Sequence, residues 1–204
     1  GSLGGGMWDV LYGKPGWFRA HHQFFFMAIV AATAGGTSFM TLCPYIAGKV
    51  MKKEVAPMET FQTLAKISGA MFIFYTTFRI YDVYTMAAKY VPSFDRNYLD
   101  IWGGYYGIWM LVFEFAACFT AIAMLNIKKF RDQEKFMVIG ISSGVAAIIM
   151  SKLYVVLHGF SIPNFPWKSF AAYNPTIQEW FITTGGLCCM IAIYMIMAKW
   201  FRLF

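Results

Sequence analysis

The chain has 204 residues, of which 59% are hydrophobic and only 13% are charged. A soluble domain of this size would carry about twice that charged fraction, so the composition excludes an ordinary soluble domain. The 17 Lys and Arg residues outnumber the 10 Asp and Glu residues and give a net charge of +7. These basic residues lie in short segments between apolar runs and form no continuous basic face, which excludes a nucleic-acid-binding protein.

The first residues, GSLGGGMWDVLYGKPGW, contain neither an initiator Met at position 1 nor the pattern of a signal peptide. Such a start is typical of a piece of a longer polypeptide or of a trimmed chain. The segment GKPGW predicts a turn. We expect the Trp residues around this turn to lie in the outer membrane interface, ahead of the first span.

Five apolar runs follow, each close to the 20 residues that a helix needs to cross the hydrocarbon core of a bilayer. They cover residues 22–49, 61–88, 102–126, 136–158 and 179–201. Helices satisfy their own backbone hydrogen bonds inside a bilayer. The sequence therefore predicts an all-α membrane protein with five transmembrane helices, forming a four-helix bundle plus one flanking helix in a single transmembrane domain over residues 1–204.

The Lys and Arg residues between these runs predict the orientation of the spans. One side would carry Lys49, Lys52, Lys53, Lys128, Lys129, Arg131, Lys135, Lys199 and Arg202. The other side would carry Lys14, Arg19, Lys89, Arg96 and Lys168. The positive-inside rule makes the first side cytoplasmic. The N-terminus is then outside and the C-terminus is in the cytoplasm, as five spans require.

Ionisable residues inside the predicted spans are the candidate functional residues. An ionised group at mid-bilayer costs about 2.5–3.5 kcal/mol, so such residues are expected to face a partner, a cavity or water. Arg79 and Asp82 are three residues apart and share one helix face, where they can pair. Lys152 and His158 in the fourth span are expected at a similar depth in the outer half, with Glu114 of the third span beneath them.

Two interpretations of this charged layer remain open. The first is a structural salt-bridge network that fixes the helix register. The second is a polar pocket or a proton path. Glu114 has no partner nearby in sequence, so it is the better candidate for a protonatable relay group, with simple pairing to Lys152 as the alternative. The candidates for a proton path are Arg79, Asp82, Glu114, Lys152 and His158.

Redox centres are not predicted within the chain. The four cysteines form no C-x-x-C motif, which argues against an iron–sulfur or zinc site and favours packing roles. A haem held by His158 together with His21 or His22 stays open as an alternative. Two stacked haems would need more histidines than the 3 in the chain. We assign no catalytic residue and no metal ligand.

Residues 151–160, SKLYVVLHGF, and residues 173–204, YNPTIQEWFITTGGLCCMIAIYMIMAKWFRLF, place a Pro and a Glu directly before the final span. This arrangement resembles the C-terminus of the NrfD-like family, the polysulfide-reductase-type membrane subunits. FRIYDVY at residues 78–84 resembles the Arg-x-x-Asp element in the seventh helix of that family. GSLGG at residues 1–5 resembles the turn after its fifth helix, without the His-Gln-Ser-Ser sequence that usually precedes this turn.

The resemblance implies that the five spans correspond to the second half of a ten-helix subunit. Subunits of this family exchange electrons and protons with a quinone pool and dock an iron–sulfur protein. The quinone of such a complex would be menaquinone, and the iron–sulfur clusters would lie in a ferredoxin-like partner. The family's quinone pocket is generally placed in the first bundle, so no quinone ligand is assigned here. The charged interior of the second bundle would be a proton route, lined by Arg79, Asp82, Glu114 and Lys152.

We therefore expect an integral membrane subunit of a respiratory oxidoreductase complex in a bacterial or archaeal cytoplasmic membrane. Two functions from other classes remain as alternatives. One is a small transporter or channel, although the sequence lacks the paired Gly- or Pro-broken helices typical of transporters. The other is a purely structural membrane anchor.

Overall fold

The computed structural model describes residues 24–52, 56–85, 87–88, 107–161 and 176–200. Within them lie five long helices and one short helix, and no strand. They are α3 (Phe24–Met51), α4 (Met58–Thr85), α6 (Gly107–Asn126), α7 (Lys128–Arg131), α8 (Glu134–Ser161) and α9 (Ile177–Trp200). Each predicted span overlaps one long helix over most of its length. The prediction of an all-α fold is thus confirmed for the described residues, while the short helix α7 was not predicted.

Three of the helices are long and apolar enough to cross a membrane: Ile29–Val50 in α3, Ile108–Asn126 in α6 and Glu134–Leu153 in α8. The chain is therefore a multi-pass membrane protein. The helix α4 does not meet the same standard of apolarity among the described residues, since it carries Lys66, Arg79 and Asp82 within its length. That α4 and α9 also cross the membrane stays a prediction.

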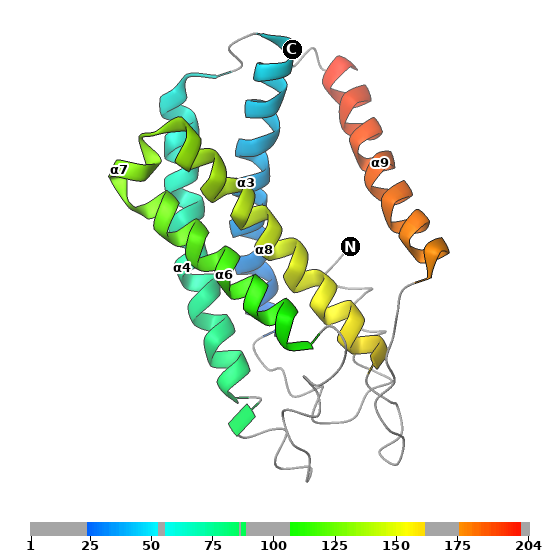
Figure 1. Cartoon of the computed structure of the whole chain (residues 1–204). Coiled ribbons are helices and arrows are strands. Elements are labelled where there is room, and N and C mark those ends of the chain that lie inside the picture. The colour runs from blue at the N-terminus through cyan, green and yellow to red at the C-terminus, as the bar shows by residue number, and fades with distance from the viewer. Residues whose placement is uncertain (1–23, 53–55, 86, 89–106, 162–175, 201–204) are drawn as a thin grey trace. The chain divides into compact units, whose positions relative to one another are not determined.

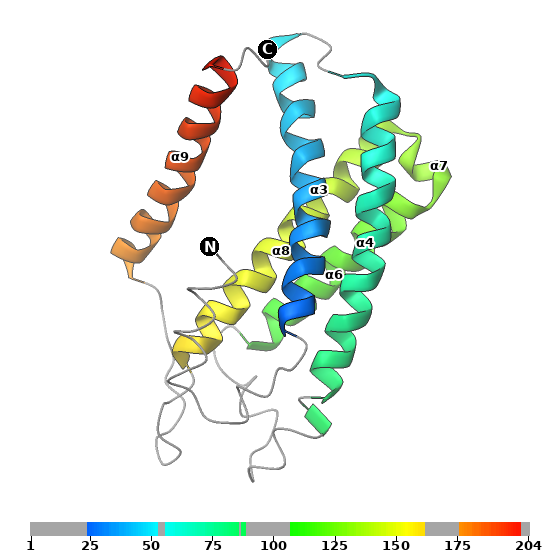
Figure 2. The same cartoon turned by 180° about the vertical axis from the view of Figure 1, so that it is seen from behind.

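The four helices α3, α4, α6 and α8 form an up-and-down bundle within the compact unit that ends at Ala172 (Figures 1 and 2). Each of them packs mainly against two others, in the ring order α3, α4, α6, α8, and α4 also contacts α8 across the ring. The bundle part of the prediction is confirmed. The helix α9 belongs to a second unit, Tyr173–Phe204, and is described by itself.

The ring closes because each helix carries a buried stripe whose residues recur at spacings of three and four. On α4 the stripe consists of Phe61, Ala65, Ser68, Phe72, Tyr75, Arg79 and Asp82. Similar spacings connect buried residues on α3 (Ala31, Ala34, Ser38, Thr41) and on α6 (Met110, Glu114, Ala117, Ala121, Leu125). This spacing keeps one face of a helix toward its neighbours.

The faces that point away from the bundle axis are mostly apolar, with Lys66 and Lys152 as exposed exceptions. They expose large side chains such as Phe39 and Met40 on α3, Phe74 on α4 and Trp109 on α6. The stripes that face inward contain Ser, Thr, Arg, Asp and Glu side chains. A membrane bundle has this distribution, because lipid solvates the outer apolar side chains and cannot solvate polar ones.

Glycines allow the helices of the bundle to approach closely. A Cβ atom added at Gly140 on α8 would lie 2.7 Å from Leu125 Cδ2 and 2.8 Å from Met124 Cβ of α6. One added at Gly69 on α4 would lie 2.8 Å from Leu125 Cβ. All three distances are shorter than real Cβ contacts, so Leu125 is enclosed by glycine surfaces from two helices.

One end of the bundle, where α3 ends and α8 begins, carries exposed lysines such as Lys49, Lys128 and Lys135, and we name it the basic end. The Tyr45 hydroxyl of α3 donates to Glu134 Oε1 of α8 at 2.6 Å. Lys49 Nζ lies 2.7 Å from the same carboxylate oxygen and 5.6 Å from the centre of the Tyr45 ring. The Lys49–Glu134 pair is partly exposed, so its contribution to stability is modest.

The helix α9 begins with a capping box formed by Thr176 and Glu179. The Glu179 Oε2 atom accepts hydrogen bonds from Thr176 N at 2.7 Å and from Thr176 Oγ1 at 2.9 Å, and Glu179 N donates to Thr176 Oγ1 at 3.3 Å. These bonds satisfy backbone donors that a helix start leaves free. The Glu ahead of the final span, which carried part of the family resemblance, therefore has a local structural role.

We predict that Gly140→Ala destabilises the bundle by about 1–3 kcal/mol, the usual effect of overpacking a well-filled core. The added methyl group would have to displace Leu125 and the base of the Met124 side chain, which lies on the α6 backbone. The midpoint of thermal unfolding in detergent should fall. Gly36→Ala on α3 is the matched control, since a Cβ atom there meets nothing within 4 Å. An equal fall in both variants would contradict this account of the packing.

Candidate functional site

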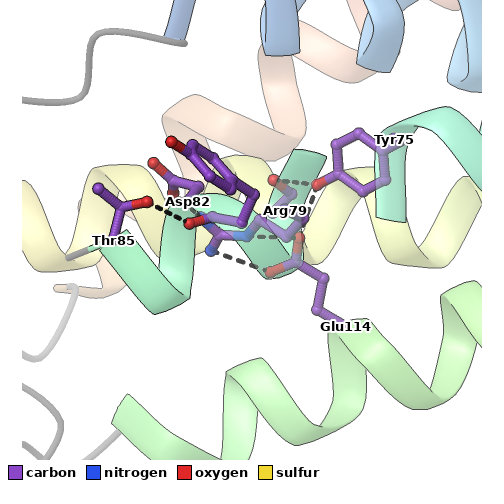
Figure 3. Close-up of polar contacts among 7 residues, drawn as sticks. Tyr75, Arg79, Asp82, Thr85 and Glu114 are labelled. Atoms are coloured by element: carbon purple, nitrogen blue, oxygen red, sulfur yellow. Dashed lines mark hydrogen bonds and ion pairs between the residues drawn. The ribbon is translucent and has the colours of Figure 1, made fainter. Parts of the chain in front are cut away.

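Three of the ionisable residues singled out in the sequence lie inside the bundle. Glu114 is fully buried, and Arg79 and Asp82 expose 5% and 6% of their surfaces. Their side chains meet between α4 and α6, away from the apolar outer faces (Figure 3). The prediction that these three residues turn away from lipid and share one interior space is confirmed.

The guanidinium group of Arg79 lies between two carboxylates. Its Nε and Nη2 atoms donate to Glu114 Oε1 and Oε2 at 3.1 Å and 3.2 Å, a two-pronged contact between α4 and α6. Its Nη1 atom donates to Asp82 Oδ2 at 3.0 Å, one turn along the same helix. Planar two-pronged contacts of this kind are among the strongest hydrogen-bonded ion pairs in proteins.

The Tyr75 hydroxyl brings a third helix into contact with this group. It lies 2.6 Å from Glu114 Oε1 and 2.7 Å from Ser151 Oγ of α8, and both bonds are buried. Glu114 Oε1 therefore accepts from Tyr75 as well as from Arg79. We name the five residues Tyr75, Arg79, Asp82, Glu114 and Ser151 the charged cluster.

The helix stripes explain why these residues meet. Tyr75, Arg79 and Asp82 are successive members of the buried stripe of α4, at spacings of four and three. Glu114 occupies the corresponding stripe of α6, and Ser151 faces inward from α8. A little farther along α4, the Thr85 hydroxyl donates to the Tyr81 carbonyl at 2.6 Å and stays within its own helix (Figure 3).

Lys152 does not join the charged cluster, which corrects the predicted layer. The residue is exposed, and no described contact connects it to Glu114. The alternative of a Glu114–Lys152 pair is not what the structure shows, since Arg79 donates to both oxygens of the Glu114 carboxylate and Lys152 is exposed. The depth of Lys152 was predicted by counting residues along the chain. Lys152 follows Ser151 by one residue, so its side chain leaves α8 about 100° around the helix from that of Ser151.

His158 lies within α8, but its side chain is outside the described residues, as are His21 and His22. The haem alternative and the place of His158 in the charged layer therefore stay predictions. Within the described ranges, no three His, Cys, Asp or Glu side chains are grouped so that they could hold a metal ion.

Tyr75 and Ser151 were not predicted as site residues. A signal for Tyr75 was present, because it precedes Arg79 by four residues and so lies on the same helix face. A Tyr hydroxyl inside a bundle also needs a hydrogen-bond partner, and the nearest polar face was the one with Arg79 and Asp82. Ser151 gave no such signal, since a single Ser in a membrane helix is usually a packing residue.

The charged cluster has the chemistry needed to hold and exchange a proton. Its described members include one guanidinium and two carboxylates, a formal charge of −1 when both carboxylates are ionised. The hydroxyl groups of Tyr75 and Ser151 can both donate and accept hydrogen bonds, so they form a hydrogen-bonded chain from Glu114 to α8.

Comparison with known proteins gives one informative match. No family model matches the sequence, and no solved structure gives a significant match. A curated relative is the "Menaquinone reductase, integral membrane subunit" of Nitratidesulfovibrio vulgaris (strain Hildenborough). The two proteins are 27% identical over 203 residues, which cover 95% of this chain and 46% of the relative. The chain thus spans about half the length of the relative it matches and is similar to it along almost its whole length.

Proposed function

We propose that this chain is part of an integral membrane subunit of a respiratory oxidoreductase complex that exchanges electrons with the menaquinone pool. The name of its relative supports this function, and the similarity extends over 95% of the chain. The apolar outer faces of α3, α4 and α6 support the same membrane setting. Within such a subunit, the bundle serves as a proton path.

The observation that carries the proton path is the position of Glu114. This carboxylate is fully buried in a membrane bundle and contacts both a guanidinium group and a Tyr hydroxyl. Reduction of a quinone to a quinol consumes protons as well as electrons, and the protons come from one side of the membrane. A buried carboxylate in a polar interior is the usual element of a proton relay.

The topology and partners of the subunit follow from the same proposal. All five long helices, α4 and α9 included, cross the membrane, with the N-terminal side outside and the C-terminal side in the bacterial or archaeal cytoplasm. The basic end of the bundle then faces the cytoplasm, in accord with the positive-inside rule. The chain forms the second half of a ten-helix subunit, and a ferredoxin-like partner with iron–sulfur clusters exchanges electrons with the quinone. No quinone-binding residue is assigned to this chain.

A purely structural role is the second candidate, because the cluster also ties three helices together. Arg79 connects α4 to α6, and Tyr75 connects both of them to α8. Contacts of this kind fix helix register, and removing one partner of a buried ion pair is strongly destabilising. The two functions differ in what a neutral replacement does to turnover per assembled complex.

We predict that Glu114→Gln, which keeps the side-chain volume and removes the exchangeable proton, lowers quinone-linked turnover and proton uptake in liposomes. Both rates should fall at least several-fold, since loss of a general acid–base group typically costs 10²–10⁴-fold where proton transfer limits the rate. Rates are measured on the native complex and normalised to the amount of assembled complex, so that a loss of assembly is not counted as a loss of activity.

The matched control is Glu59→Gln, the same change at an exposed carboxylate in the first turn of α4. It should leave both rates unchanged. Wild-type turnover and proton uptake per assembled Glu114→Gln complex would retire the relay and leave the structural role as the function of the cluster.

We predict that Tyr75→Phe also slows proton uptake, because it removes the hydroxyl that joins Glu114 to Ser151. It should lower stability by about 1–3 kcal/mol through the lost buried hydrogen bonds and the partners left behind. The matched control is Tyr81→Phe on the same helix, whose side chain is exposed. A loss of stability with an unchanged rate of proton uptake would show that Tyr75 positions Glu114 without carrying its proton.

A further inference from the structure

A second group of polar side chains lies in the bundle between the charged cluster and the basic end. The hydroxyl groups of Ser38 on α3 and Ser68 on α4 are 2.6 Å apart, and both residues are fully buried. Thr41, one turn farther along α3 toward the basic end, is buried as well and donates to the Thr37 carbonyl at 2.7 Å. We name these three residues, Ser38, Ser68 and Thr41, the hydroxyl cluster.

Phe72 lies between the hydroxyl cluster and the charged cluster. It is fully buried and stands between Ser68 and Tyr75 in the stripe of α4. Its ring meets the Tyr75 ring edge to face, with centroids 6.3 Å apart and planes at 87°. The next stripe residue toward the charged cluster is therefore Tyr75, which contacts Glu114. The next one toward the basic end is Ser68, which contacts α3.

Gly144 on α8 leaves room for the Phe72 ring next to the hydroxyl cluster. A Cβ atom added at Gly144 would lie 2.5 Å from Phe72 Cε2 and 3.1 Å from Ser38 Oγ. One point on α8 is thus close to both the aromatic ring and the Ser38 hydroxyl, and only a glycine leaves room for the ring there. Along the bundle the order is Ser38–Ser68, the Phe72 ring on Gly144, and then Tyr75 with Glu114.

We propose that the Phe72 ring, which packs on Gly144, is a hydrophobic barrier that divides the proton path between the hydroxyl cluster and Glu114. This proposal rests on the proposed function. Protons move along hydrogen-bonding side chains and water, and a buried aromatic ring offers neither. Apolar constrictions of this kind gate membrane pathways by excluding water. At rest the ring keeps the two polar segments apart, and movement of the ring away from Gly144 joins them.

The barrier gives Phe72 a role that packing alone would not. A bundle with a continuous polar interior would let protons leak down their gradient without turnover. With the ring in place, protons that reach Ser38 and Ser68 stop there. The Glu114 carboxylate then exchanges protons with these two hydroxyls only when the ring has moved.

The test measures passive proton permeation with the native complex reconstituted in liposomes, with a pH-sensitive dye inside and without quinone or electron donor. Phe72→Ala should raise the permeation rate several-fold after an acid jump, and Phe72→Leu should raise it less, because Leu refills part of the space. The matched control is Phe74→Ala, the same change on the same helix at a side chain that is 56% exposed and lies outside the buried stripe. Its permeation rate should stay at the wild-type value.

The double variant Phe72→Ala with Glu114→Gln separates a path through Glu114 from a leaking cavity, and it should return permeation to the wild-type rate. Permeation that rises equally in Phe74→Ala, or that is unaffected by Glu114→Gln, would overturn the barrier. Wild-type permeation in both Phe72 variants would also overturn it, while the proposed function would stand if Glu114→Gln alone still slowed proton uptake. Should Phe72→Ala fail to assemble, the same comparison is made with Phe72→Leu, alone and combined with Glu114→Gln.

Discussion

The two-pronged contact between Arg79 and Glu114 is the interaction on which the interior of the bundle depends. A guanidinium and a carboxylate taken out of water lose several kcal/mol each in hydration, and only close pairing with further hydrogen bonds offsets that loss. Asp82 and Tyr75 provide these further bonds, at 3.0 Å and 2.6 Å. Because Arg79 and Glu114 lie on different helices, the pairing also sets the height of α4 relative to α6. The two ions are thus stable inside the membrane only in this packing, and the packing holds them together.

The helices and their polar stripe could be predicted from sequence because both depend on periodicity along one chain. Apolar runs of the right length gave the five helices, and the three-residue spacing of Arg79 and Asp82 gave their shared face. Lys152 shows where this reasoning ends. Counting residues fixes how deep a side chain lies, but its direction around the helix depends on which neighbours surround α8. Ser151 faces the interior and Lys152, its neighbour, is exposed.

The partner of Glu114 could not be read from sequence for a related reason. Two basic residues, Arg79 and Lys152, were expected near its depth, and the sequence does not say which helices are adjacent. The structure places α4 and α8 on either side of α6, so both helices are in reach. Which basic residue pairs with Glu114 depends on which side chain lies on a buried stripe. Arg79 lies on the buried stripe of α4, whereas Lys152 of α8 is exposed. The roles of Tyr75 and Ser151 could be predicted from the same stripes once it is known which helices are neighbours.

The α4 stripe combines tight packing and proton chemistry in one row of residues, and this has a consequence for the proposed path. Ser68, Phe72, Tyr75 and Arg79 each contact a different neighbour: Ser38 on α3, Gly144 on α8, Ser151 on α8 and Glu114 on α6. A change in the charge of Glu114 alters its attraction to Arg79, and since Arg79, Tyr75 and Phe72 are successive residues of one helix face, a small rotation of α4 shifts all three together. Close-packed interiors respond to such changes by moving between discrete arrangements. If Glu114 is the proposed relay and Phe72 the proposed barrier, the protonation of one and the displacement of the other are connected through α4.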